Sequence, residues 1–174
     1  MQDHPLHLFK YCPVCGSSNF HVHNFKSKKC DCCGFIYYFN AASSTAAFIT
    51  NQAGELLVAK RAKEPAKGTL DLPGGFVDMN ETAEEAIIRE ISEETGLKVN
   101  SPTYLFSLPN IYVYSGLEIH TVDMFFEMNV SKIAHIHADD DVAELIWLKK
   151  ENINPDLFGL NSIRQGIVKW LSAR

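Results

Sequence analysis

The stretch that decides the fold lies at the centre of the chain and reads GFVDMNETAEEAIIREISEETGL, residues 75 to 97. Thr82 and Glu85 have the spacing of a capping box, in which the two side chains satisfy backbone N–H groups at a helix start. Gly96 suits the position just after a helix, because glycine readily adopts the left-handed conformation found there. The stretch therefore predicts a helix from about Ala83 to Thr95.

Three carboxylates of this helix fall on one side. Glu90, Glu93 and Glu94 span about 100° of arc, and like charges three and four residues apart repel each other. Ile87 and Ile91 fill the neighbouring arc and should face the core, so the glutamates flank the buried face instead of lying opposite it. Carboxylates at the edge of a cleft suit a hard cation such as Mg²⁺ or Mn²⁺. A solvated acidic face is the alternative that the cluster alone leaves open.

The wider pattern resembles the Nudix box, which reads Gly, five residues, Glu, seven residues, Arg-Glu, an apolar residue, any residue, Glu-Glu, any residue, Gly and an apolar residue. A match at nine positions over 23 residues is far more specific than a lone glycine motif. The resemblance implies an α/β (α+β) fold, the Nudix α/β/α sandwich, in which the box forms a loop, a helix and a loop. The matching positions are Gly75, Glu81, Arg89, Glu90, Ile91, Glu93, Glu94, Gly96 and Leu97.

The resemblance also implies a chemistry. Nudix proteins hydrolyse a nucleoside diphosphate linked to another moiety and use Mg²⁺ or Mn²⁺. Glu90, Glu93 and Glu94 match the metal-binding positions, and the main-chain carbonyl of Gly75 is expected to complete the shell. Bound metal neutralises the diphosphate and lowers the pKa of a water molecule. Glu94 is the candidate base for that water.

Two further roles are carried over from the resemblance. Arg89 and Glu81 match a pair that orients the catalytic helix, with Glu81 also reaching the metal through water. Glu144, three residues before Trp147, resembles a downstream metal-binding glutamate of the NADH pyrophosphatase-type subgroup. A charge at a strand edge is the alternative for Glu144.

All five cysteines lie in the first fifth of the chain. Cys12 and Cys15 form one C-x-x-C pair, Cys30 and Cys33 form another, and a glycine follows each pair. Four thiolates close a tetrahedral structural zinc site, and the spacing is close to that of a zinc ribbon. Such a site leaves no position for water, so the zinc should be structural and should drive folding of the segment. Cys32 is left over; two disulfides or buried thiols are the alternatives.

The expected organisation is a zinc ribbon at residues 1–40 and a Nudix domain at residues 41–174. A ribbon ahead of a Nudix domain resembles the NADH pyrophosphatase-type subgroup. That subgroup carries a Ser-Gln-Pro-Trp-Pro-Phe-Pro stretch after the box, whereas residues 107–116 read SLPNIYVYSG and lack the Trp and the Phe. The choice between NADH, NAD and ADP-ribose as substrate therefore stays open.

Alternating apolar residues predict strands on both sides of the central helix. Mixed strands with two widely spaced helices indicate an α/β or α+β sandwich. The expected strands are residues 45–50, 55–61, 97–107, 111–114, 117–130 and 143–148, with a loop at 139–141 and a C-terminal helix over 162–172.

Four side chains are candidates for substrate binding. Arg61 and Lys67 precede the box and would meet phosphate groups, with a solvated loop as the alternative. Tyr112 and Tyr114 would stack on a nucleobase, but alternating tyrosines are more often ordinary sheet residues.

Charge and hydropathy narrow the class of protein. The net charge is −5, and residues 1–40 carry four lysines against two aspartates, so the acidic charge lies in the remainder. An acidic body is a poor nucleic-acid surface, and the family resemblance implies a small-molecule nucleotide as the partner. No apolar run reaches the roughly 18 residues of a membrane helix, and no signal-peptide segment is visible. We expect a cytoplasmic protein without a membrane partner, and the family resemblance points to a homodimer.

Three functional hypotheses follow. The leading one is an enzyme that cleaves the diphosphate bond of a NADH, NAD or ADP-ribose type of substrate and releases a nucleoside monophosphate. A second is a nucleotide-sensing or nucleic-acid-binding regulatory protein with the ribbon as the reader. A third is a hydrolase of oxidised nucleoside triphosphates or of capped RNA. The complete glutamate set argues against the second, because a sensor need not keep three mutually repelling carboxylates.

Overall fold

The computed structural model describes residues 4–130 and 142–173. The chain forms two compact units, one comprising Met1–Ala41 with Tyr112–His120, the other Ala42–Ile111 with Thr121–Arg174. A short hairpin tip thus groups with the N-terminal segment, which the expected division at residue 40 did not include. Independent folding of the two expected domains stays a prediction, and the loop expected at 139–141 lies outside the described residues.

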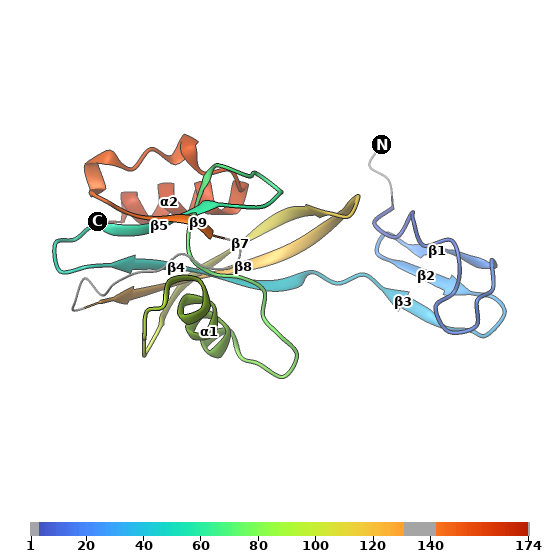
Figure 1. The fold of residues 1–174 in the computed structure, drawn as a ribbon. Helices are drawn as coiled ribbons and strands as arrows, with labels where there is room; N and C mark the ends of the chain where they lie inside the picture. Colours follow the sequence, from blue (N-terminus) through green and yellow to red (C-terminus); the bar gives the residue numbers. More distant parts are fainter. Residues whose placement is uncertain (1–3, 131–141, 174) are drawn as a thin grey trace. The chain divides into compact units, whose positions relative to one another are not determined.

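The first unit contains a three-stranded antiparallel sheet in the order β1-β2-β3 (Figure 1). The strands are β1 (Phe20–Asn24), β2 (Ser27–Cys30) and β3 (Ile36–Tyr38). Its main apolar cluster is small and contains buried Cys12, Phe20 and Cys30, with Phe9 and Phe35 packed against them, and Leu6 is also buried in this unit. So few apolar side chains do not stabilise a fold without a further link such as a metal.

The second unit is built on a six-stranded mixed sheet in the order β6-β5-β4-β8-β7, with β9 paired to β5. β4 and β8 run parallel, from Ala42 opposite Thr121 to Thr50 opposite Asn129. The strands are β4 (Ala42–Thr50), β5 (Leu56–Arg61), β6 (Leu70–Asp71), β7 (Thr103–Tyr114), β8 (Leu117–Asn129) and β9 (Val142–Leu148).

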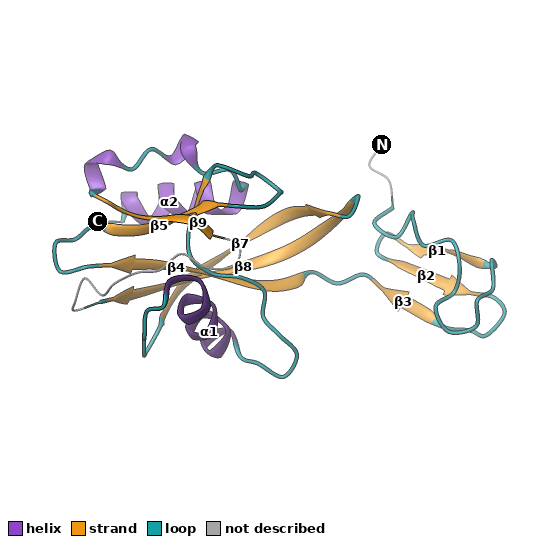
Figure 2. Ribbon diagram, in the orientation of Figure 1, coloured by secondary structure: helices purple, strands orange, loops and turns teal. Residues whose placement is uncertain are grey.

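Helices cover both faces of this sheet (Figure 2). α1 (Ala83–Thr95) covers one face, α2 (Asn161–Ser172) covers the other, and two 3₁₀ turns, η1 (Lys150–Asn152) and η2 (Pro155–Leu157), precede α2. The expected α+β sandwich is therefore confirmed. No helix in the described ranges has the length and apolar character needed to span a bilayer.

Each helix packs on its own apolar core. Ile87 and Ile91 of α1 are fully buried against Ala47, Ile49 and Phe126 of the sheet. On the other face, α2 packs on a core that includes a parallel stack of Phe48 and Trp170, with ring centroids 5.0 Å apart. The alternation of the strands separates the two cores, because successive side chains point to opposite faces.

One part of the sheet differs from the expectation. The strands expected at 97–107 and 111–114 are a single strand, β7, that begins only at Thr103. Pro109 lies within β7 although proline cannot donate a ladder hydrogen bond. β7 is the last strand of the sheet order, and an edge strand tolerates a proline.

Candidate active site and cysteine cluster

The central helix begins and ends where its local signals predict. Thr82 Oγ1 accepts a hydrogen bond from the Glu85 N–H (3.2 Å), and the Glu85 carboxylate accepts one from the Thr82 N–H (2.8 Å). Gly96 ends the helix in the left-handed conformation with φ 69°. Burial of Ile87 and Ile91 then fixes the helix rotation, so the glutamates emerge beside the core.

Arg89 holds several of these carboxylates together. Its Nε and Nη2 atoms donate to the two oxygens of Glu81 at 2.8 and 2.9 Å. Its Nη1 atom donates to Glu90 at 2.9 Å and to Glu93 at 3.1 Å. The bond from Arg89 lowers the pKa of the Glu81 carboxyl, and the same partners raise the pKa of the guanidinium. One cation therefore offsets part of the repulsion among three acids, and its bidentate pair with Glu81 ties the loop to the helix.

Glu90 lies directly against the backbone of Gly75. A Cβ atom at residue 75 would lie 2.4 Å from Glu90 Oε1, so any side chain there would displace the carboxylate. Burial raises the pKa of Glu90 although Arg89 opposes this shift. The carboxylate is thus partly desolvated without full compensation, which is the setting in which a further cation fits.

Glu94 and the glycine loop are also joined. The Gly74 N–H donates to Glu94 Oε2 at 2.9 Å. The Gly75 carbonyl accepts from the Thr45 N–H at 2.8 Å and from Thr45 Oγ1 at 3.3 Å. The carbonyl predicted as a metal ligand therefore faces β4, and the hydrogen bond from the hydroxyl is the longer of the two. Its role as a ligand stays a prediction.

Glu144 lies on the α2 side of the sheet, opposite the face that α1 covers. It pairs with Lys60 across β5 and β9 and alternates with Ile146 and Leu148, which pack on the α2-side core. Leu145 packs on the α1-side core from the opposite face of β9. The structure does not bring Glu144 to the glutamates of α1, so its metal-binding role gains no support and stays a prediction.

The candidate phosphate-binding residues differ in their surroundings. Arg61 Nη1 forms an ion pair with Asp71 at 2.5 Å, and its Nε donates to the Pro65 carbonyl at 2.7 Å. Lys67 is exposed in the loop between β5 and β6. The guanidinium of Arg61 therefore has structural partners, whereas the ammonium of Lys67 faces solvent.

The candidate stacking residues lie near the end of β7. Tyr112 is half-buried and Tyr114 is 65% exposed. Both belong to the first unit, with the hairpin tip. Their role in stacking stays a prediction.

A buried polar cluster escaped the sequence reasoning. The Asp123 carboxylate on β8 accepts hydrogen bonds from Ser44 and Thr121, both at 2.5 Å, and from Ser162 at the start of α2. It ties two strands and a helix together on the α2 side of the sheet. One signal in the sequence could have revealed it: Asp123 lies two residues before Phe125, at a position where the alternating pattern predicts a buried side chain.

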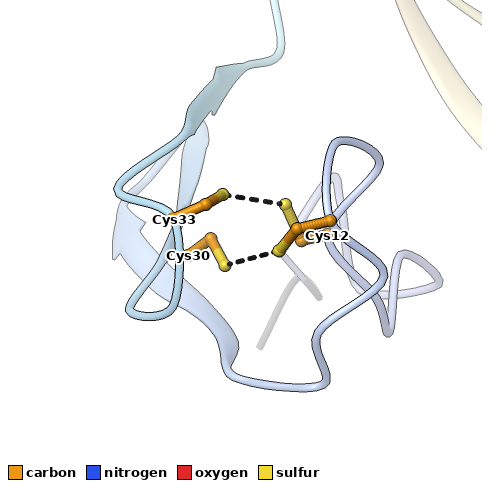
Figure 3. A group of neighbouring side chains, drawn as sticks. Cys12, Cys30 and Cys33 are labelled. Atoms are coloured by element: carbon orange, nitrogen blue, oxygen red, sulfur yellow. Dashed lines mark hydrogen bonds between the residues drawn. The ribbon is translucent and has the colours of Figure 1, made fainter.

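The four paired cysteines gather in one place. Cys12 Sγ lies 3.7 Å from Cys33 Sγ, and Cys15 Sγ lies 3.6 Å from Cys30 Sγ (Figure 3). All four sulfurs lie within 4.8 Å of one another. A tetrahedral site with metal–sulfur distances of about 2.3 Å has sulfur–sulfur edges of roughly 3.8 Å, so the cluster fits such a metal. Cys32 is exposed and lies outside it.

Backbone N–H groups favour the thiolate form of Cys30, whereas burial and the neighbouring thiols raise the pKa of the Cys15 and Cys33 thiols. Hydrogen bonds from the Cys33 and Cys32 backbone lower the pKa of the Cys30 thiol to about 7. Elsewhere in the described residues, no other group of three or more His, Cys, Asp or Glu side chains converges in this way. The carboxylates of α1 are instead arranged around Arg89.

The chain is similar to known proteins over most of its length. The model of the NUDIX domain matches residues 41–171. An ADP-ribose pyrophosphatase from Methanocaldococcus jannaschii is 34% identical over 124 residues, which is 70% of each chain. The NAD-capped RNA hydrolase NudC of Vibrio vulnificus is 25% identical over 158 residues, and the alignment covers 87% of this chain but 55% of that relative. The chain thus spans about half the length of the latter protein.

The solved structures show the same fold. A NUDIX hydrolase from Nitrosomonas europaea superposes with a TM-score of 0.74 over 95% of this chain and 92% of that chain, at 21% identity. A MutT NUDIX hydrolase from Burkholderia pseudomallei gives a TM-score of 0.63 over 74% of this chain and 97% of that chain, at 25% identity.

Proposed function

The chain belongs to the NUDIX family, and from that premise we propose that it is a metal-dependent hydrolase of nucleoside diphosphate derivatives. It cleaves the diphosphate bond between a nucleoside monophosphate and a second moiety, and it releases the nucleoside monophosphate. The observation that carries the proposal is the placement of Glu90 against Gly75, where the partly desolvated carboxylate lies next to Glu93 and Glu94 on the exposed edge of α1.

This donor set suits Mg²⁺ or Mn²⁺, since hard cations take carboxylate oxygens together with water and phosphate oxygens. Glu90, Glu93 and Glu94 would hold the ion. When bound, the ion neutralises charge on the diphosphate and acidifies a water molecule.

The residues of the chain position these groups. Arg89 keeps Glu81, Glu90 and Glu93 at fixed distances, so the carboxylates need little rearrangement when substrate binds. The Gly74 N–H orients the Glu94 carboxylate, whose oxygens can accept a proton from attacking water. Fixing acceptor and substrate in this way lowers the entropic part of the barrier.

The relatives guide the choice of substrate. Because one relative is an ADP-ribose pyrophosphatase and another a hydrolase of NAD-capped RNA, we propose ADP-ribose first, then NADH and NAD, with NAD-capped RNA as the second candidate class. All four share an adenosine diphosphate linked to another group. Lys67 is the better placed phosphate contact, since Arg61 is already paired with Asp71.

We further propose that Cys12, Cys15, Cys30 and Cys33 hold a structural zinc ion. The sulfur–sulfur distances of 3.6 and 3.7 Å support this, and so does the small core of the first unit. Thiolate ligands persist in a reducing compartment, which favours a cytoplasmic location. A homodimer remains a prediction from the family resemblance, and sedimentation of the purified chain tests it.

A substrate panel tests the proposed activity. ADP-ribose, NADH, NAD, an oxidised nucleoside triphosphate and a NAD-capped oligonucleotide are each incubated with Mg²⁺ or Mn²⁺, and released AMP or other nucleotide is quantified by chromatography. We expect AMP from ADP-ribose or NADH and little action on a simple phosphomonoester. A Glu93→Gln variant is the matched control, because it keeps the side-chain shape. If no diphosphate-linked nucleotide is cleaved with either ion, the enzyme assignment fails and a nucleotide sensor takes its place.

A further inference from the structure

The first unit contains a cavity that the proposed hydrolysis does not use. It is open to solvent and has a volume of about 500 Å³, within the range of roughly 300–1,000 Å³ that is usual for small-molecule sites. Its walls come from four segments that are distant in sequence: the N-terminal turn, the turn between β1 and β2, the segment after β3, and the start of β8. All lining residues belong to the first unit. The glutamates of α1 belong to the second unit.

Four aromatic rings line this cavity. Phe39 and His120 meet edge to face with ring centroids 6.1 Å apart. Phe25, in the turn between β1 and β2, is 81% exposed although it is a large apolar side chain. A flat aromatic ligand would cover this ring and gain stacking energy, whereas the protein alone leaves most of it exposed.

His4 lines the cavity, and both of its ring nitrogens have backbone partners. Its Nδ1 atom accepts a hydrogen bond from the Leu6 N–H at 3.2 Å, and its Nε2 atom lies 2.8 Å from the Asn24 carbonyl. Because Nδ1 is the acceptor, Nε2 carries the proton and donates to that carbonyl. With both nitrogens satisfied by the backbone, the ring serves as a fixed, flat wall.

The cavity also has charged groups of both signs. Lys26 contributes an ammonium, and among the described residues it makes no ion pair within 4.0 Å. Glu118 and His120 lie two apart on β8, so both point to the same side of the strand and into the cavity. A cation suits a phosphate, and a carboxylate suits an exocyclic amine of a base.

We propose that this cavity is a second nucleotide site that takes a nucleoside monophosphate, with its base among the aromatic rings and its phosphate at Lys26. The proposal goes beyond the hydrolysis assigned to α1, because it requires neither a divalent cation nor the glutamates of α1. Adenosine monophosphate carries the aromatic base, the exocyclic amine and the phosphate that the lining residues match.

Calorimetric titration with AMP tests the site, using the full chain with its own zinc and no added divalent cation. The wild-type protein should bind AMP. Phe25→Ala should weaken binding by about 5- to 150-fold, the range given by the stacking energy of one base. Lys26→Gln should weaken AMP but leave adenosine unchanged. Val22→Ala is the matched control, because Val22 is 60% exposed on β1 and lies outside the cavity.

Phe25 and Lys26 are not core residues, so both variants should keep their zinc content and melting temperature. Glu94→Gln should lose turnover and still bind AMP in this assay, which separates the second site from the proposed function. Absence of AMP binding to the wild-type protein, equal affinity of the Phe25→Ala variant, or loss of binding in Glu94→Gln would each overturn the proposal. A short oligoadenylate that binds more than tenfold tighter than AMP would overturn the assignment to a mononucleotide.

Discussion

Replacing Gly75 by alanine should disable the site while leaving the fold intact. Gly75 does not have a left-handed φ, so alanine can adopt its backbone conformation without strain. The variant also keeps the main-chain carbonyl that was predicted as a metal ligand. The new Cβ atom would lie 2.4 Å from Glu90 Oε1, so the perturbation acts on one carboxylate.

The size of the effect follows from this distance. Ordinary van der Waals contact with a Cβ atom begins at 3.4 Å, so the Glu90 carboxylate must retreat by about 1 Å. A displacement of this size among the catalytic groups of an active site lowers the rate on the order of 100-fold, which corresponds to about 2.7 kcal/mol in the activation barrier. The free energy of unfolding should change by less than about 1 kcal/mol, because the flexible end of a side chain can move and alanine restricts the unfolded chain.

The assay is AMP release from ADP-ribose with Mn²⁺, measured for the wild-type protein, Gly75→Ala, Glu90→Ala and the double variant. In the Glu90→Ala background the clash is absent, so adding Gly75→Ala should lower the residual rate by less than threefold. Mn²⁺ affinity, measured by electron paramagnetic resonance, should follow the same pattern. Gly75→Ala turnover within threefold of wild type, or an equal loss in both backgrounds, would refute the reasoning.

Three other changes have defined outcomes. Glu94→Gln should abolish most turnover without lowering the melting temperature of the metal-free protein. Added Mn²⁺ should raise the free energy of unfolding of the wild-type protein by about 2.7 kcal/mol at a hundredfold excess over Kd, and that of the variant by less. Normal turnover of the variant would contradict the proposed metal site. Wild-type protein should carry about one zinc per chain by elemental analysis, and Cys15→Ser should lose both zinc and hydrogen-exchange protection in residues 10–38. A zinc-free wild-type protein would exclude the ribbon. Arg61→Met should destabilise the fold by about 3–5 kcal/mol at pH 7, because Asp71 is left buried without its cation. Burial already raises the Asp71 pKa, and losing Arg61 raises it further. The loss of unfolding free energy in the variant should therefore shrink as the pH falls toward about 3.9, the pKa of an aspartate in the unfolded chain. A loss that is independent of pH in urea unfolding would contradict this account.

Local signals in the sequence determined the two helices, the cysteine pairs and the acidic side of the central helix. The expected limits of the central helix, Ala83 and Thr95, agree with the structure because the capping box and the terminal glycine act within a few residues. The C-terminal helix was expected over 162–172 and runs from Asn161 to Ser172, since its apolar period alone identifies it. Sequence spacing also identified the two cysteine pairs and the acidic side of the central helix.

The environment of those carboxylates is visible only in the tertiary structure. The sequence places Glu93 beside Arg89, because residues four apart are neighbours on a helix. It does not show that Glu90 lies against Gly75 or that the Gly75 carbonyl faces β4, because both depend on the path of the loop along that strand. The face on which Glu144 lies depends in turn on the pairing of β9 with β5.

The sequence by itself therefore determined the family, the helix that carries the carboxylates and the cysteine pairs, all of which depend on residues a few positions apart. Only the tertiary structure decided the Asp123 cluster, whose partners Ser44 and Ser162 lie 79 and 39 residues away, and the pairing of Arg61 with Asp71. The physical reason is strand register. A shift of one residue would turn every side chain of β8 to the opposite face, and this register is set by packing and strand pairing across the whole second unit.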